Sequence, residues 1–199
     1  KDAVRKLEEK LQKLNAGDYE PDATEAGMPV EEITRKAEAE LQKQTRIANF
    51  MPILGCEMYV ARRGDKSLRS GKIDHSGWHL IVLAKNEKGY HNLIKLVSRS
   101  WVDGFYMRPR TDPSDLKKYH EGLIVSSACL GGEVAQKIMK STPEEVDKTI
   151  LWYKEVFGDD YYLELMRHEV KNPAIRANRD TYPLQKEVNK KLEELSEKH

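Results

Sequence analysis

The sequence has few cysteines, no long hydrophobic run and almost no net charge. Its 199 residues include two cysteines, Cys56 and Cys129, which are too few for a disulfide framework. No apolar stretch approaches the ~20 residues that a membrane-spanning helix needs, and the charged first residues lack the apolar core of a signal peptide. A formal net charge of +1 gives no global attraction to DNA or to anionic membranes. We therefore expect a reduced, cytoplasmic protein without a membrane partner.

Charged residues and helical periodicity are abundant instead. Charged residues make up 34% of the chain and hydrophobic residues 39%, which is typical of one core with long solvated helices. Apolar residues at helical spacing predict one helix that begins near Val4 and ends before Gly17, and a second over 30–48. We predict that 1–48 form a helical hairpin insertion, distinct from a domain over 49–199.

From Phe50 onward, short apolar runs alternate with helical segments. Strands are predicted at 51–60, 79–84, 122–130 and 161–166, and helices at 85–102, 113–120, 142–158 and from about 182. The third of these helices opens on a capping box, with Thr142 as N-cap and Glu145 three residues later. This alternation predicts an α/β architecture, either an open sheet or a barrel.

Three side chains that can bind a metal stand at the ends of predicted strands: Glu57, His79 and Cys129. Functional groups of α/β enzymes gather at one rim of the sheet, and carboxylate, imidazole and thiolate together suit zinc. Glu57 lies in an otherwise apolar strand, so its carboxylate needs a partner. The alternatives are that Cys129 is a small buried hydrophobe and that His79 is a structural hydrogen-bonding residue, which are the commoner roles.

The spacing of two of these residues makes a geometric prediction. Glu57 and His79 meet only if their strands run antiparallel, as in a hairpin with a long loop over 61–78. We therefore predict an antiparallel pair inside an otherwise parallel sheet.

The connector 99–110 is basic and aromatic. Its arginines Arg99, Arg108 and Arg110 can contact the phosphates of a nucleic acid, with aromatic rings nearby for stacking on bases. The alternative is a packed surface loop with solvent-exposed arginines, which the near-zero net charge favours. The role of His168 stays open between a side chain that points into the site and one that caps a loop.

The same residues carry a resemblance to a known family. In this order, PILGCEMYVA, HLIVLAKNEKGYHNLIKLVS, DGFYMRPRTD, EGLIVSSACLGGEV and WYKEVFGDDYYLELMRH resemble the PHP domain of bacterial DNA polymerase III alpha subunits, over roughly residues 50–199. The resemblance implies a distorted seven-stranded α/β barrel with a metal cluster at one rim. Glu57, His79 and Cys129 match three of the family's ligand motifs. An early His-x-His, a Thr-Asp-His and a late Asn-Asp-x-His motif are absent here, so we expect a partial PHP domain truncated at both ends.

The function that this resemblance implies is DNA replication. The parent protein would perform template-directed DNA synthesis with magnesium at a site outside this chain, together with the other polymerase III holoenzyme subunits. The PHP domain would resemble a metal-dependent 3′–5′ exonuclease or phosphoesterase that uses zinc or manganese, and the chain alone would be inactive, without catalytic residues for polymerisation. In other members the domain is a non-catalytic structural and docking module for the polymerase and its proofreading subunit, and both possibilities stay open. The GFYMRPR and WYKEVFGDD blocks disfavour a stand-alone phosphoesterase.

Overall fold

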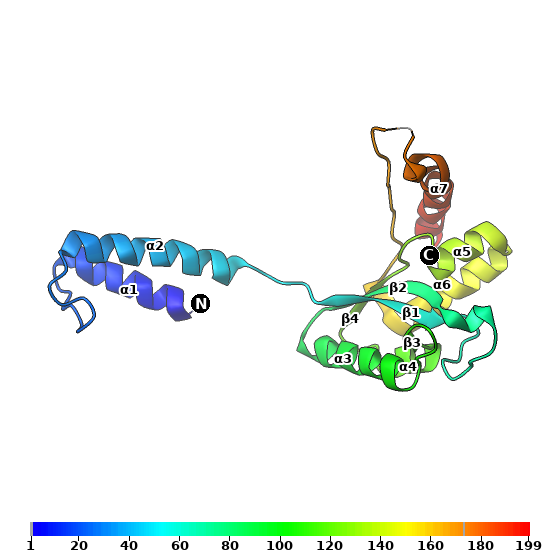
Figure 1. Cartoon of the computed structure of the whole chain (residues 1–199), viewed down its shortest axis with the longest axis horizontal. Helices are drawn as coiled ribbons and strands as arrows, with labels where there is room; N and C mark the ends of the chain where they lie inside the picture. The colour runs from blue at the N-terminus through cyan, green and yellow to red at the C-terminus, as the bar shows by residue number, and fades with distance from the viewer. Residues whose placement is uncertain (1, 173) are drawn as a thin grey trace. The chain divides into compact units, whose positions relative to one another are not determined.

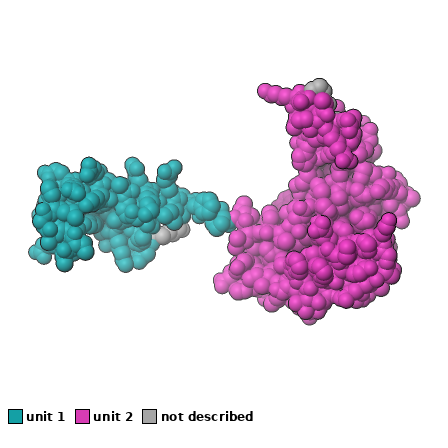
Figure 2. All heavy atoms as spheres, in the orientation of Figure 1, with its two compact units in different colours: residues 1–52 teal, residues 53–199 magenta. Residues whose placement is uncertain are grey.

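The computed structural model describes residues 2–172 and 174–199. The chain divides into two compact units between Pro52 and Ile53 (Figure 2). This division lies close to the predicted boundary after residue 48. Each unit has its own buried apolar cluster.

The first unit is a pair of helices, α1 (Asp2–Ala16) and α2 (Val30–Asn49). Gly17 follows α1 with φ 79°, a conformation that glycine adopts without steric cost, so α1 ends where the sequence predicts. The core between the helices is small, and its buried members are Leu14, Ile33 and Ala37. A core of this size fits helices whose apolar faces are narrow.

The second unit contains a sheet that has, within the described residues, five strands. The strands are β1 (Gly55–Ala61), β2 (Gly77–Ala84), β3 (Arg110–Thr111), β4 (Leu123–Ser126) and β5 (Tyr161–Tyr162), in the order β3-β1-β2-β4-β5. β2 is antiparallel to both β1 and β4, whereas β1 pairs with β3, and β4 with β5, in parallel. The predicted antiparallel pair is present, but the sheet holds a second antiparallel pairing because β2 alone runs in the opposite direction. The sheet does not close, which is consistent with a partial barrel.

Helices surround this sheet (Figure 1). They are α3 (Glu87–Val102), α4 (Pro113–Lys118), α5 (Glu133–Lys140), α6 (Pro143–Phe157) and α7 (Tyr182–Lys198). The capping box of α6 is confirmed: the Glu145 N–H bonds to the Thr142 side chain, and the Glu145 carboxylate accepts the Thr142 N–H. None of the helices in the described residues has the length and hydropathy that crossing a bilayer requires.

Alternate side chains of the central strands form the core face of the sheet. Its buried residues are Met58, Val60, Leu80, Val82, Leu123 and Val125, which cluster with residues of α3 to α7 such as Leu96, Leu116, Val134, Ile150 and Val188. Because successive side chains of a strand point to opposite faces, Glu57 and His79 lie on the other face. That face is less completely covered, and it carries the candidate site.

The predicted strands differ from the observed ones at their ends, and β2 begins at Gly77 and β4 covers only Leu123–Ser126. Residues 51–54 do not belong to β1; they connect the two units, and Met51 and Ile53 are 84% and 73% exposed. Pro52 has no N–H to donate to a sheet, which fits this role. Of the predicted strand 161–166, only the first two residues pair with β4. The two-residue strand β3 was not predicted, since its sequence is that of a Pro-broken connector.

Candidate metal site

The hairpin of β1 and β2 brings the first two candidate ligands together. In its register Glu57 faces Ile81 and Tyr59 faces His79. Glu57 and His79 are therefore diagonal neighbours on the same face of the sheet. The connecting loop covers 62–76, within two residues of the predicted loop at each end.

Three potential ligand atoms converge on this face. Oε1 of Glu57 lies 2.7 Å from Nδ1 of His79, and Sγ of Cys129 lies 3.4 Å from the same nitrogen. All three atoms lie within 4.8 Å of one another. The structure thus gathers the three predicted residues from β1, β2 and the loop after β4, with Nδ1 as the central atom.

A tight turn after β4 directs Cys129 toward His79. Ala128 has φ 59°, a left-handed conformation that is uncommon for a residue with a side chain. The Gly131 N–H donates to Sγ of Cys129 at 3.3 Å, and the Gly131 carbonyl accepts the His79 N–H at 3.0 Å. Residues in such sparsely populated conformations cluster at functional sites. The turn ties the thiol to the strand that carries the imidazole.

Two further residues, which the sequence did not indicate, hold the imidazole ring in place. The ring of Tyr59 meets the His79 ring edge to face, with centroids 5.1 Å apart and planes at 86°. On the other side, a Cβ added to Gly131 would lie 3.0 Å from the His79 ring. Gly131 therefore leaves the space that the ring occupies.

The donor set and its spacing fit a divalent metal. Bonds of 2.0–2.3 Å to a tetrahedral zinc place two ligand atoms roughly 3.3–3.8 Å apart. The 3.4 Å separation of Sγ and Nδ1 falls in this range. Oε1 of Glu57 accepts a hydrogen bond from Nδ1 at 2.7 Å, and only a small side-chain movement would bring this oxygen to the ligand spacing. The Glu57 side chain is 52% exposed and that of His79 is 31% exposed, so the site is open on one side to further ligands.

The second cysteine is not part of this site. Cys56 precedes Glu57, so its side chain points to the core face, where it packs against the buried cluster. Burial, together with the negative charge of Glu57, raises the pKa of the Cys56 thiol. A neutral thiol on the opposite face does not serve as a ligand here.

We expect Gly131→Ala to weaken metal binding by about tenfold, because the new methyl group would push the His79 ring out of place. Titration of the 199-residue chain with zinc in competition with a chromophoric chelator measures the change. The control is His91→Ala, which removes an exposed histidine on α3. Equal zinc affinities for Gly131→Ala and the native chain would contradict the positioning role of Gly131.

The three arginines predicted to contact nucleic acid have different environments. Arg110 is fully buried and donates to the carbonyls of Gly104, Leu68 and Lys66, so it is not available to a phosphate and that prediction is corrected. A buried guanidinium is stable here because its donors meet backbone acceptors. Arg99 is part-exposed and already paired with Asp115 and Asp103. Arg108 is exposed.

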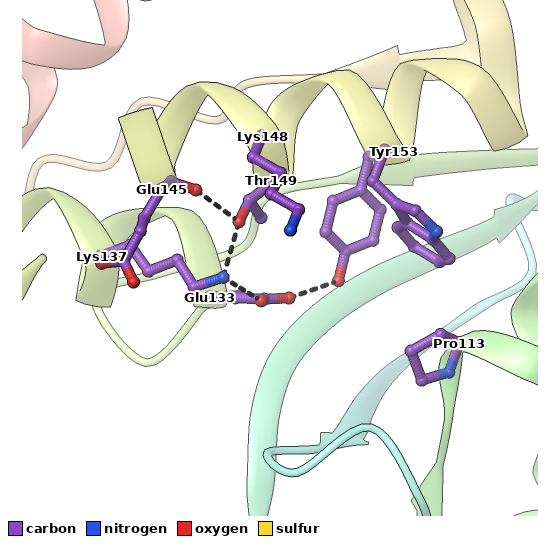
Figure 3. Close-up of a pocket in the computed structure, with 8 residues that line it drawn as sticks. Pro113, Glu133, Lys137, Glu145, Lys148, Thr149 and Tyr153 are labelled. Atoms are coloured by element: carbon purple, nitrogen blue, oxygen red, sulfur yellow. Dashed lines mark hydrogen bonds and ion pairs between the residues drawn. The ribbon is translucent and has the colours of Figure 1, made fainter. Parts of the chain in front are cut away.

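His168 and a polar cavity beside α5 and α6 lie apart from the three ligands. The His168 N–H and ring both bond to the side chain of Gln185 on α7, which fits a structural role. Figure 3 shows a cavity of about 330 Å³ beside α5 and α6. In it Lys137 contacts both Glu133 and Thr149, and the Tyr153 hydroxyl donates to Glu133. These polar groups satisfy one another, so the cavity offers no free set of functional groups.

Comparison with known proteins places these residues in a family. The PHP domain family matches residues 17–168, so the match begins within the first unit. The chain is 47% identical to the DNA polymerase III subunit alpha of Borreliella burgdorferi over 133 residues, which are 67% of this chain and 12% of that protein. It is 38% identical to the protein of the same name from Deinococcus radiodurans over 135 residues, 63% of this chain and 10% of that one. The Thermus aquaticus protein of that name is 34% identical over 161 residues, 80% of this chain and 12% of that one.

Proposed function

Because the chain belongs to the PHP domain family, we propose that it is part of a replicative DNA polymerase III alpha subunit and contributes to a metal-dependent phosphoesterase site. The observation that carries the proposal is the convergence of Glu57, His79 and Cys129 within 4.8 Å. The chain spans only 10–12% of the relatives described above. In this proposal, DNA synthesis and its magnesium site lie in other parts of the parent protein. DNA and the other holoenzyme subunits are its proposed partners, and the cytoplasm is its proposed location.

The reaction proposed for the complete site is hydrolysis of a phosphodiester at a 3′ end of DNA. A bound divalent metal lowers the pKa of a coordinated water and stabilises the negative charge that develops on the phosphate. The residues of this chain would hold the metal: Nδ1 of His79, Sγ of Cys129 and one carboxylate oxygen of Glu57. Tyr59 and Gly131 keep the imidazole oriented, which limits the reorganisation that binding requires.

We propose zinc as the metal, with manganese as the alternative. Thiolate and imidazole donors favour zinc, whereas manganese prefers oxygen ligands and would depend mainly on Glu57. The three residues leave at least one coordination position for water or for ligands from elsewhere in the parent protein. With an open and incomplete ligand set, the chain alone should bind metal weakly and turn over no substrate.

A nuclease assay on the full-length parent protein tests this function. The substrate is a single-stranded oligonucleotide labelled at its 5′ end, incubated with zinc or manganese in the absence of nucleotides. Removal of 3′ nucleotides should fall by at least roughly 100-fold in Glu57→Gln, His79→Ala and Cys129→Ser, while primer extension stays at the native level. His91→Ala is the control, since His91 is exposed on α3.

The second candidate function is a non-catalytic structural and docking module for the polymerase and its proofreading subunit. The observation that favours it is the exposure of the cluster: the Glu57 side chain is half exposed, and the described residues hold only these three grouped ligands. On this alternative the three variants leave nuclease activity unchanged. They would instead change binding of the proofreading subunit, measured with the purified proteins.

A further inference from the structure

An exposed pair of stacked aromatic rings lies at the C-terminal end of α3. Trp101 and Phe105 have centroids 5.5 Å apart and ring planes at 14°, and they are 58% and 44% exposed. Met107, in the same turn, is 63% exposed. Burial of such rings is favourable, so an exposed stacked pair marks a surface for a flat or apolar partner.

A distant loop with several basic residues is joined to the segment that carries this pair. Arg110 donates to the carbonyls of Lys66 and Leu68 in the loop 62–75 and to the carbonyl of Gly104 in the turn 99–110. Its buried guanidinium therefore ties the loop to the turn. A contact between Arg69 and the Asp103 carbonyl adds a second link.

The joined segments carry a local excess of positive charge. Residues 62–75 and 99–110 hold eight Lys or Arg against three Asp, although the whole chain has a net charge of only +1. Of these cations, Lys66 and Arg99 are paired with Asp112 or Asp115 outside the two segments, and Arg110 is buried. Two of the aspartates are already neutralised: Asp74 is buried and paired with Arg63, and Asp103 is paired with Arg99. Among the described residues, Lys72 and Arg108 are exposed and take part in no ion pair.

We propose that these residues form a binding surface for single-stranded DNA, separate from the three metal ligands. The surface consists of Arg69, Lys72, Trp101, Phe105 and Arg108. Unpaired cations attract the phosphates, and the exposed aromatic rings stack on bases, which only an unpaired strand presents. A protein partner is the alternative, since protein interfaces are also rich in aromatic rings and arginine, and it predicts no saturable binding of an oligonucleotide.

The surface is adjacent to β1, which bears one of the three metal ligands, Glu57. A small cavity of about 70 Å³ is lined by Glu57 and Tyr59 of β1 together with Trp101 and Pro109. Single-stranded DNA bound to the aromatic pair would therefore pass close to β1. The proposal does not depend on metal binding, since none of the surface residues is one of the three ligands.

The test measures how tightly the 199-residue chain binds a fluorescently labelled oligothymidylate of about 12 nucleotides. Fluorescence anisotropy reports the binding, at low salt and in the presence of EDTA. Trp101→Ala should weaken binding at least about fivefold, whereas Trp101→Phe, which keeps a stacking ring, should stay within about twofold of the native chain. Leu151→Ala removes an equally exposed apolar side chain on α6 and should change nothing.

The charge contribution is measured separately through salt dependence. The double variant Lys72→Gln with Arg108→Gln should lower the slope of log affinity against log salt by about 1.4, which is roughly 0.7 for each lost contact with a single strand. Lys190→Gln, an exposed lysine on α7, should leave the slope unchanged.

Three results would overturn the proposal: no saturable binding by the native chain, equal affinity of Trp101→Ala and the native chain, or equal affinity for duplex and single strand. Thermal melting of each variant shows that the fold is retained, and Trp101→Phe with the charge variants suffices if Trp101→Ala does not fold. Because EDTA removes metal, DNA binding in this test does not depend on the metal site. Failure of the metal site would leave DNA binding unchanged, and failure of the DNA surface would leave zinc binding unchanged.

Discussion

Lys66→Met is expected to destabilise the second unit by about 3–5 kcal/mol. Nζ of Lys66 lies 2.9 Å from Asp112 and 2.8 Å from Asp115, and the three side chains are 9%, 6% and 4% exposed. Methionine fills similar space but leaves two buried carboxylates without this cation. Removing one partner of a buried ion pair costs more than the pair contributes, because the remaining charge is poorly solvated.

The two aspartates have other contacts in the fold, so the loss of Lys66 should cost more than the loss of a lysine from a surface ion pair. Asp112 accepts the N–H of Asp115 and so caps α4, while Asp115 keeps one other cation, Arg99. The matched control is Lys88→Met, because Lys88 pairs with Glu121 at 3.5 Å on the exposed surface and its loss should cost less than about 1 kcal/mol. Urea unfolding of both variants measures the difference. A cost below about 1 kcal/mol for Lys66→Met would contradict the role of this cluster.

The contribution of this cluster to stability depends on pH. Burial alone would raise the pKa of Asp112, but hydrogen bonds from Ser114, the Asp115 N–H and Lys66 outweigh it and lower the pKa. Burial likewise opposes the charge of Lys66, but Asp115 and Asp112 raise its pKa above the ordinary value. A carboxyl group with a lowered pKa stabilises the fold at pH values above its unfolded-state pKa of about 4. A lysine with a raised pKa stabilises it at pH values below its unfolded-state pKa of about 10.4. The stability difference between native chain and Lys66→Met should therefore be largest between these limits and shrink outside them.

His79→Ala is expected to lower the zinc affinity of the chain by at least roughly 100-fold. Nδ1 of His79 is the atom that both other ligands approach, at 2.7 Å from Glu57 and 3.4 Å from Cys129. Without it, the carboxylate and the thiol are left as two separated donors. The side chain is 31% exposed, so the truncation should alter the melting temperature in EDTA only slightly.

Chelator competition with the 199-residue chain measures this loss. His91→Ala removes an exposed histidine of α3 and serves as the matched control. Zinc affinity that is equal in His79→Ala and in the native chain would mean that any bound zinc lies elsewhere on the chain.

Features that depend on the pattern of residues within one short segment could be predicted from the sequence. Alternating burial in a strand places Glu57 and His79 on one face once their strands are antiparallel, and that pairing is the one observed. The capping box at Thr142 depends on residues three apart, so it too is visible locally. The convergence of Cys129 on this pair was also expected, although the left-handed Ala128 that produces it was not.

The burial of charged side chains was the main feature that could not be predicted. Lys66 and Arg110 stand in segments that look like solvated basic loops. Their burial depends on contacts with residues far away in the chain, such as Asp112 for Lys66 and the Leu68 carbonyl for Arg110. Such contacts carry no local periodicity, so only the folded structure reveals that Arg110 joins two loops instead of contacting phosphate.

The most direct test of the metal site is X-ray absorption at the zinc edge for the zinc-loaded 199-residue chain and its Cys129→Ser variant. Coordination by Glu57, His79 and Cys129 predicts one sulfur at about 2.3 Å and nitrogen or oxygen ligands at about 2.0–2.2 Å, with the sulfur lost in the variant. A native spectrum with only nitrogen and oxygen ligands, or a sulfur that persists in Cys129→Ser, would contradict the site.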